Sequence, residues 1–172
     1  HIDVQYNTKV LQQITTFNQR SSHSDSILNK SEIRLMTWAV QLHDIGLVIN
    51  FKKRQHHGAY IIQHNDMPGF TLTEKSTIAL LVKNHRGKIQ LPSPSQESDY
   101  CLPLPRIILL IQILRIALLS VQVRLPDHTR KVSIGANEQS VVISVLQSNV
   151  SNKHLVDEIT RQQKLGLAIS IK

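Results

Sequence analysis

Apolar residues near the start of the chain recur at steps of three and four, which is the spacing of one helix face. Val10, Ile14 and Phe17 therefore predict a helix over residues 4–18. The polar run RSSHSDSILNK follows at 20–30 and is typical of a turn region. The pattern thus predicts one amphipathic helix followed by a break.

A capping box opens the second predicted helix, because Asn29 stands three residues before Glu32. Met36, Val40 and His43 then continue an apolar face at steps of four and three. The stretch WAVQLHDIGLVI therefore places a His-Asp pair in an apolar environment. Such a pair is either a divalent metal site for phosphate chemistry or a buried polar pair without chemistry.

Two further helices follow a basic connector, FKKRQHHG. In the first helix, His57 shares one face with an isoleucine and a second histidine. The second helix begins at a capping box formed by Thr71 and Glu74, and its apolar face includes His85. Glycine and prolines in the stretch 86–102 then predict a long loop.

The longest apolar run, residues 107–119, lies in a helix predicted from Pro103 or Pro105 to about Arg124. Arg115 and a glutamine interrupt the run, and it is shorter than the roughly 20 residues that cross a bilayer. We therefore predict a buried core helix and no transmembrane segment.

Valine and isoleucine become frequent after residue 126, which favours short strands over helices. The predicted order is strand, strand, helix, strand, at residues 131–134, 140–146, 151–164 and 167–171. The chain is therefore expected to be mainly α, with a helical domain at 1–126 and a small α+β (β-β-α-β) lobe at 127–172.

The overall charge narrows the possible partners. A net charge of +8 and an isoelectric point of about 9.9 favour an anion: nucleic acid, nucleotide, polyphosphate or an acidic membrane surface. Aromatic residues make up only 4% of the chain, too few for the stacking platforms of a single-strand binder, so nucleic acid is disfavoured.

Cys101 is the only cysteine, which excludes an internal disulfide and favours a cytoplasmic, at most membrane-peripheral, location.

Three stretches carry a resemblance by their order and spacing: LHDIGLVI, HHGAYIIQHNDMPGF and IALLVKNHRGK. They are similar to the C-terminal part of bacterial exopolyphosphatases and guanosine pentaphosphate phosphohydrolases. The resemblance implies an HD-like helical domain followed by the small α+β lobe. It also implies a preceding actin-like ATPase-fold region that carries the catalytic residues and uses Mg²⁺. The 172-residue chain, which begins at His1, is then expected to be a fragment with no catalytic residue or cofactor of its own.

An active HD phosphohydrolase has the order His…His-Asp…Asp, because imidazole and carboxylate together hold a metal and its activated water. His43 and Asp44 match the central pair. The resemblance places the first histidine at Tyr6 and the last aspartate at Leu118. A phenol and an aliphatic side chain thus replace two ligands, and the pair is expected to be degenerate and to hold no metal.

An alternative ligand set stays open from the sequence. His57 and His85 lie on apolar helix faces and could approach His43 and Asp44, and three imidazoles with one carboxylate can bind Zn²⁺. If any metal binds, these four residues are the candidates. The chain would then be an autonomous metal-dependent HD phosphohydrolase acting on nucleotides.

Basic residues are the candidates for binding polyphosphate, because arginine and lysine give charge-assisted hydrogen bonds to phosphate. Most of them form two groups near the histidines, and one lies in the long apolar helix. The candidates are Lys52, Lys53, Arg54, His57, His85, Arg86, Lys88 and Arg115. Together with Arg106 and Arg124, these residues could line one groove for a long polyanion.

Arg115 needs a partner, because an unpaired charge in an apolar helix is costly. The sequence leaves open whether Asp44 or a polar cleft between domains supplies it.

We expect the fragment to bind inorganic polyphosphate, to contact the ATPase-fold domains of its own protein and to support a homodimer. The choice between polyphosphate and guanosine pentaphosphate lies mostly in those other domains.

Overall fold

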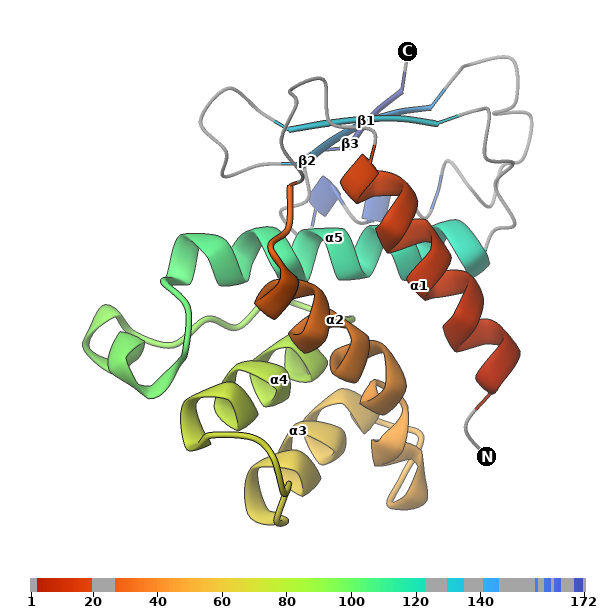
Figure 1. Ribbon diagram of the computed structural model, residues 1–172. Helices are drawn as coiled ribbons and strands as arrows, with labels where there is room; N and C mark the ends of the chain where they lie inside the picture. Colours follow the sequence, from red (N-terminus) through yellow and green to blue (C-terminus); the bar gives the residue numbers. More distant parts are fainter. Residues whose placement is uncertain are drawn as a thin grey trace.

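The structure is a computed structural model that describes residues 3–19 and 27–122, three strands of the tail and five single helical positions between 157 and 164. Most of this described part is helical (Figure 1). The helices are α1 (Val4–Gln19), α2 (Lys30–Leu42), η1 (Ile45–Val48), α3 (Arg54–His64), α4 (Leu72–Asn84), η2 (Pro94–Asp99) and α5 (Leu104–Gln122), where η marks a 3-10 helix. The prediction of a mainly helical protein is confirmed.

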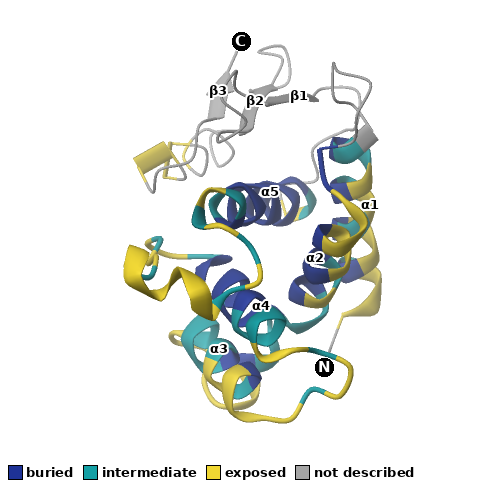
Figure 2. Ribbon diagram, turned by 60° about the vertical axis from the view of Figure 1, so that its left-hand side comes forward, coloured by how far each residue is buried: buried dark blue, intermediate teal, exposed yellow. Residues whose placement is uncertain are grey.

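The long apolar helix α5 forms the core. Residues 109–120 are all buried, and α1, α2 and α4 contact this helix (Figure 2). Among the described residues, α5 is the one helix whose length and composition would also suit a membrane span. However, 72% of its most apolar stretch is buried inside the protein, as the prediction of a core helix requires.

Both predicted capping boxes are present. The Asn29 side chain accepts from the Glu32 backbone N–H at 2.9 Å, and the Glu32 carboxylate accepts from the Asn29 N–H at 2.9 Å. Thr71 and Glu74 repeat this exchange at 3.2 and 2.8 Å. The pKa of Glu74 is lowered, mainly because the Thr71 N–H donates to its carboxylate. These contacts fix where α2 and α4 begin, and therefore where the histidines at their ends lie.

Thr71→Ala should lower the free energy of unfolding by about 1 kcal/mol, because a backbone N–H at the start of α4 loses its acceptor. Thr8→Ala is the control, since the exposed Thr8 hydroxyl donates to the Val4 carbonyl oxygen within α1; it should change stability by less than about 0.5 kcal/mol. The Glu74 contribution is present above its unfolded pKa and is lost as the pH falls through the lowered folded value. Urea unfolding at neutral and acidic pH measures both effects, and equal losses for the two threonines would contradict the capping role.

Two segments predicted as irregular are partly helical. Lys53 is the N-cap of α3 with a left-handed φ of 57°, so Arg54 is already the first helical residue and not part of the connector. The predicted loop 86–102 contains η2, which begins with a proline and a capping box between Ser93 and Gln96. Short local signals of this kind start a helix even where prolines and polar residues are frequent.

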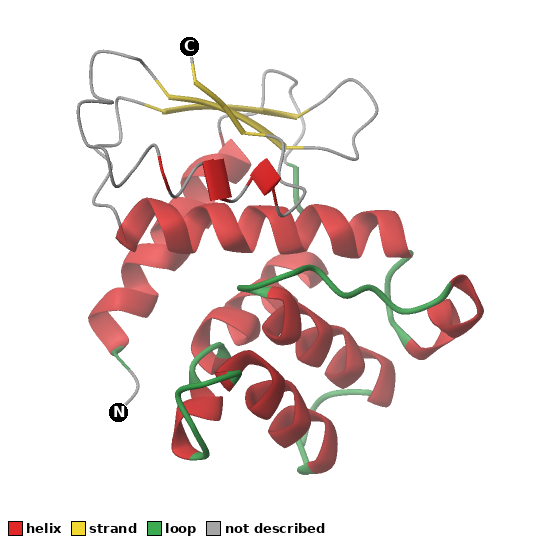
Figure 3. Ribbon diagram, turned by 180° about the vertical axis from the view of Figure 1, so that it is seen from behind, coloured by secondary structure: helices red, strands yellow, loops and turns green. Residues whose placement is uncertain are grey.

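The strands of the tail lie where the sequence predicts strands. β1 (Arg130–Ile134), β2 (Val141–Val145) and β3 (Ile169–Ile171) form one sheet in the order β1-β2-β3, alongside α5 (Figure 3). β1 and β2 are antiparallel, whereas β2 and β3 are parallel. The connecting turns and most of the predicted helix 151–164 lie outside the described residues, so the α+β lobe and its boundary after residue 126 stay predictions.

Candidate functional site

The His-Asp pair lies where α2, η1 and α3 meet. His43 is the C-cap of α2, and Asp44 follows directly as the N-cap of η1. η1 approaches α3 closely because Gly46 has no side chain: a Cβ there would come 1.9 Å from the Arg54 carbonyl oxygen. The glycine of HDIG therefore determines how near α3 comes to the pair.

Hydrogen bonding fixes the orientation of the His43 ring. His43 is 5% exposed, and its Nδ1 donates to the Val40 carbonyl oxygen at 2.7 Å. Its Nε2 lies 3.5 Å from Oδ2 of Asp44. The other carboxylate oxygen, Oδ1, lies 2.8 Å from Nε of Arg54. The cation that faces the carboxylate of the pair is therefore a guanidinium from the first residue of α3.

Tyr6 and Leu118, the two positions assigned to replaced ligands, also lie at the pair. The Tyr6 hydroxyl donates to the Leu118 carbonyl oxygen at 3.3 Å, and the Tyr6 ring stacks on His43 at a centroid distance of 6.0 Å. Burial raises the pKa of Tyr6, and the Asp44 charge adds to this, so the phenol keeps its proton. The structure thus brings Tyr6 and Leu118 close to His43, and that they stand at the positions of two replaced ligands stays a prediction.

His85 takes the same position on the neighbouring helix as His43 takes on α2. It is the C-cap of α4, is 6% exposed, and its Nδ1 donates to the Val82 carbonyl oxygen at 2.7 Å. The rings of His43 and His85 meet edge to face at 5.3 Å. Nε2 of His85 is buried and has no hydrogen-bond partner among the described residues. Burial lowers the pKa of His85 to about 3, so this nitrogen carries a lone pair at neutral pH.

The neutral ring of His85 predicts a pH dependence of stability. Its folded pKa of about 3 lies below the unfolded value of 6.5, so the unfolded chain binds an extra proton between these values. Above pH 6.5 His85 is neutral in both the folded and the unfolded chain, so it should not make stability depend on pH. Below pH 6.5 the free energy of unfolding should fall by up to about 1.4 kcal/mol per pH unit. Urea unfolding across this range should show a smaller slope for His85→Asn, whereas His64→Asn, at an exposed histidine, should keep the slope. An unchanged slope in His85→Asn would show that other groups cause it.

The alternative metal set is only partly assembled. His85 approaches His43 as expected, but His57 lines neither of the two cavities that border the pair. Within the described part of the chain, no three His, Cys, Asp or Glu side chains are grouped so that they could hold a metal ion. The geometry therefore lends no support to three imidazoles around one ion.

A cavity of about 250 Å³ opens on one side of the pair and is strongly cationic. Among the described residues that line it there are four arginines, both buried histidines and no carboxylate. They are Tyr6, His43, Phe51, Arg54, His85, Arg86, Arg115, Leu118, Leu119, Gln122 and Arg161. A second cavity of about 300 Å³ borders the other side of the pair and is lined by Asp3 and Asp44. The two sides of the pair therefore differ in charge.

Arg115 has partners other than Asp44. It is 2% exposed, its Nε donates to the Asn84 carbonyl oxygen at 2.8 Å, and its Nη2 donates to the carbonyl oxygen of Gly87. These carbonyls lie at the C-terminal end of α4, where the helix dipole favours a cation. Arg115 is thus held in place by backbone groups while it lines the cationic cavity.

Arg106 does not belong to this site. Its Nε and Nη2 each lie 2.7 Å from a carboxylate oxygen of Glu32, at the far end of α2 from His43. Its role is therefore structural, and Arg124 lies outside the described residues.

The two basic groups of the sequence meet at Phe51. The guanidinium carbon of Arg54 lies 5.2 Å from the centroid of this ring, and that of Arg86 lies 6.0 Å from it. Lys52 and Lys88, their neighbours in sequence, are exposed. Arg54 and Arg86 therefore both line the cavity beside the His-Asp pair, and their role in binding polyphosphate stays a prediction.

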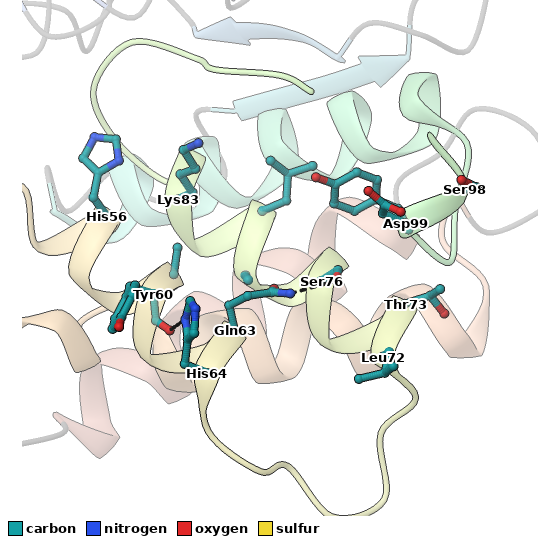
Figure 4. Close-up of a pocket in the computed structure, with 14 residues that line it drawn as sticks. His56, Tyr60, Gln63, His64, Leu72, Thr73, Ser76, Lys83, Ser98 and Asp99 are labelled. Atoms are coloured by element: carbon teal, nitrogen blue, oxygen red, sulfur yellow. Dashed lines mark hydrogen bonds between the residues drawn. The ribbon is translucent and has the colours of Figure 1, made fainter. Parts of the chain in front are cut away.

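A larger cavity, about 770 Å³, lies away from the pair, between α3, α4 and η2 (Figure 4). Tyr60 and His64 stack at 4.1 Å on its wall. Lys83 and Asp99 both line it, so their charges oppose each other. Its larger volume comes without the excess of positive charge that surrounds the His-Asp pair.

Comparison with known proteins shows the family to which the chain belongs. Residues 1–163 match the model of Ppx/GppA phosphatase, domain III. The chain therefore belongs to the Ppx/GppA phosphatase family, which confirms the resemblance found in the sequence. It is similar to the guanosine-5'-triphosphate,3'-diphosphate pyrophosphatase of Aeromonas hydrophila, with 33% identity over 138 residues, covering 77% of this chain and 27% of that protein. The chain thus spans about a quarter of the length of the curated relative that it matches.

Proposed function

We propose that this chain is an accessory domain of a Ppx/GppA-type phosphatase and that it binds the phosphate chain of the substrate. The observation that supports this most directly is the meeting of Arg54, from the start of α3, and Arg86, from beyond the end of α4, at one cationic cavity. The substrate class is inorganic polyphosphate or guanosine pentaphosphate. Hydrolysis itself belongs to actin-like ATPase-fold domains outside this chain, with Mg²⁺ as their cofactor.

A polyanion suits this surface because residues far apart in the sequence supply charge at one place. Neutralising several phosphates releases counterions, so affinity should fall steeply with salt. Affinity should also rise with chain length, because a longer chain can engage both basic groups at once. A homodimer is part of the proposal, since a second copy would double the basic surface along one polyphosphate chain.

Titration with long-chain polyphosphate tests the proposal. Lys52→Ala combined with Lys53→Ala should weaken binding about tenfold at low salt and reduce the salt dependence, because two phosphate contacts are lost. Arg54 stays intact, since its guanidinium faces the carboxylate of the pair. The charge-matched control is Lys9→Ala combined with Lys30→Ala, at exposed positions on α1 and at the start of α2. Equal losses for both double variants would mean diffuse attraction and would overturn a defined binding surface.

The rival function, an autonomous metal-dependent HD phosphohydrolase, is tested by phosphate release. We expect the isolated chain to release no phosphate from polyphosphate or guanosine pentaphosphate with Mg²⁺, Mn²⁺ or Zn²⁺, because Tyr6 and Leu118 stand where two ligands would be needed. Turnover that disappears in His43→Ala would establish the rival function instead.

A further inference from the structure

We propose that the cationic cavity beside the His-Asp pair binds a single terminal phosphoryl group, either inorganic phosphate or the end of a polyphosphate chain. This inference rests on the proposed function and deepens it, because it names the part of the ligand that enters the fold. Arg54, Arg86 and Arg115 surround the oxyanion in this proposal, and His85 accepts a hydrogen bond from its protonated oxygen.

Among the described residues that line the cavity, positively charged side chains outnumber negatively charged ones. Asp44 faces Arg54 from the neighbouring cavity, but no carboxylate lines this one among the described residues. Arg86 makes no hydrogen bond or ion pair within the described part of the chain. Burial lowers the pKa of Arg86 and the nearby charge of Arg54 lowers it further, whereas the negative charge of Asp44 raises it in part. An oxyanion between the arginines would balance this charge through charge-assisted hydrogen bonds.

His85 provides a second, independent observation. Its Nδ1 donates to the Val82 carbonyl oxygen, which leaves Nε2 as an acceptor, and this buried Nε2 has no partner among the described residues that surround the cavity. A buried polar atom without a partner is costly and calls for a donor. Free phosphate and the end of a chain carry a P–OH group near neutral pH, whereas the interior phosphates of a chain carry none. The nitrogen therefore favours the end of a chain over its middle.

The arrangement corresponds to an HD pair in which guanidinium groups replace the metal. In a metal-holding pair, a divalent cation between imidazole and carboxylate attracts the phosphate. Here the Arg54 guanidinium lies beside the Asp44 carboxylate, where a metal ion would supply the positive charge. The Tyr6 hydroxyl donates a hydrogen bond to the Leu118 carbonyl oxygen. Guanidinium groups hold an oxyanion bidentately but do not activate water. The cavity volume of about 250 Å³ leaves room for one phosphoryl group and a few waters, at about 30 Å³ for each water.

The imidazole signals of His43 and His85 in two-dimensional NMR report directly on this cavity in the 172-residue chain. We expect inorganic phosphate and linear tripolyphosphate to shift these signals saturably. Cyclic trimetaphosphate, which has no terminal phosphate, should leave them unchanged. Arg86→Gln should weaken phosphate binding by about tenfold or more, because a charge-assisted contact is lost. Arg86→Lys should lose less, and Lys9→Ala, at an exposed position of α1 outside the cavity lining, should lose nothing.

Several results would overturn the inference, and they differ from failure of the proposed function. Unshifted His85 signals at saturating phosphate would overturn it, even if long-chain polyphosphate still binds through Lys52 and Lys53. Equal shifts with cyclic and linear triphosphate would also overturn it, because they indicate general attraction to charge. Signals that shift with Zn²⁺ and not with phosphate would assign the cavity to a metal. Phosphate binding without any binding of long chains would support the cavity and overturn the wider polyphosphate surface.

Discussion

Gly46→Ala is expected to destabilise the fold by at least about 3 kcal/mol, at the upper end of what overpacking causes. A Cβ at this position would lie 1.9 Å from the Arg54 carbonyl oxygen and 2.5 Å from the Gly58 backbone nitrogen. Backbone atoms of a helix cannot rotate away as a side chain can, so α3 as a whole has to move away from η1. Because Arg54 begins that helix, the cationic cavity should be disturbed as well.

Gly69→Ala is the matched control for this prediction. Gly69 has a φ of 87°, and nothing lies within 4 Å of the place where its Cβ would be. Alanine there introduces only the strain of a left-handed backbone, about 1–2 kcal/mol. Urea unfolding of both variants measures the difference. A loss for Gly46→Ala no larger than that for Gly69→Ala would show that η1 and α3 are not in such close contact.

Arg106→Leu is expected to lower the free energy of unfolding by about 3–5 kcal/mol, the range for removing one partner of a buried ion pair. Glu32 is 1% exposed, and Arg106 binds both of its carboxylate oxygens at 2.7 Å. Arg106 also donates to the Ile27 carbonyl oxygen at 2.9 Å. Without the guanidinium, the carboxylate stays buried without its counter-charge. The starts of α2 and α5, which this pair joins, should then separate more easily.

An exposed ion pair provides the comparison for Arg106→Leu. Arg34 Nη1 lies 2.6 Å from a carboxylate oxygen of Glu74, but the Arg34 side chain is 43% exposed. Exposed pairs contribute about 0–1 kcal/mol, so Arg34→Leu should cause a much smaller loss. Adding Glu32→Gln to Arg106→Leu should restore part of the stability, because a neutral amide can still cap the Asn29 N–H. If Arg106→Leu and Arg34→Leu lowered the free energy of unfolding equally, burial of Glu32 would not be what makes the Arg106 ion pair important.

Local patterns were sufficient to predict the helices that carry the site. Helical periodicity and capping residues depend on neighbours within one or two turns, so they are visible in a single sequence. They placed His43 and His85 on inward-facing positions, and the structure confirms that both are buried. The prediction failed at the start of α3 and at η2, because a left-handed Lys53 and a cap at Ser93 are weak signals in stretches rich in polar residues.

By itself, the sequence determined the family, the positive charge and the order of the helices, and it led to the prediction that Tyr6 and Leu118 replace two metal ligands. Only the tertiary structure decided which cations face the pair. Arg106 turns away to Glu32, whereas Arg115, held by backbone carbonyls at the end of α4, lines the cavity together with Arg54 and Arg86. The physical reason is that such contacts join residues from different helices. Their existence depends on how those helices cross, and a backbone carbonyl is identical at every position of the sequence.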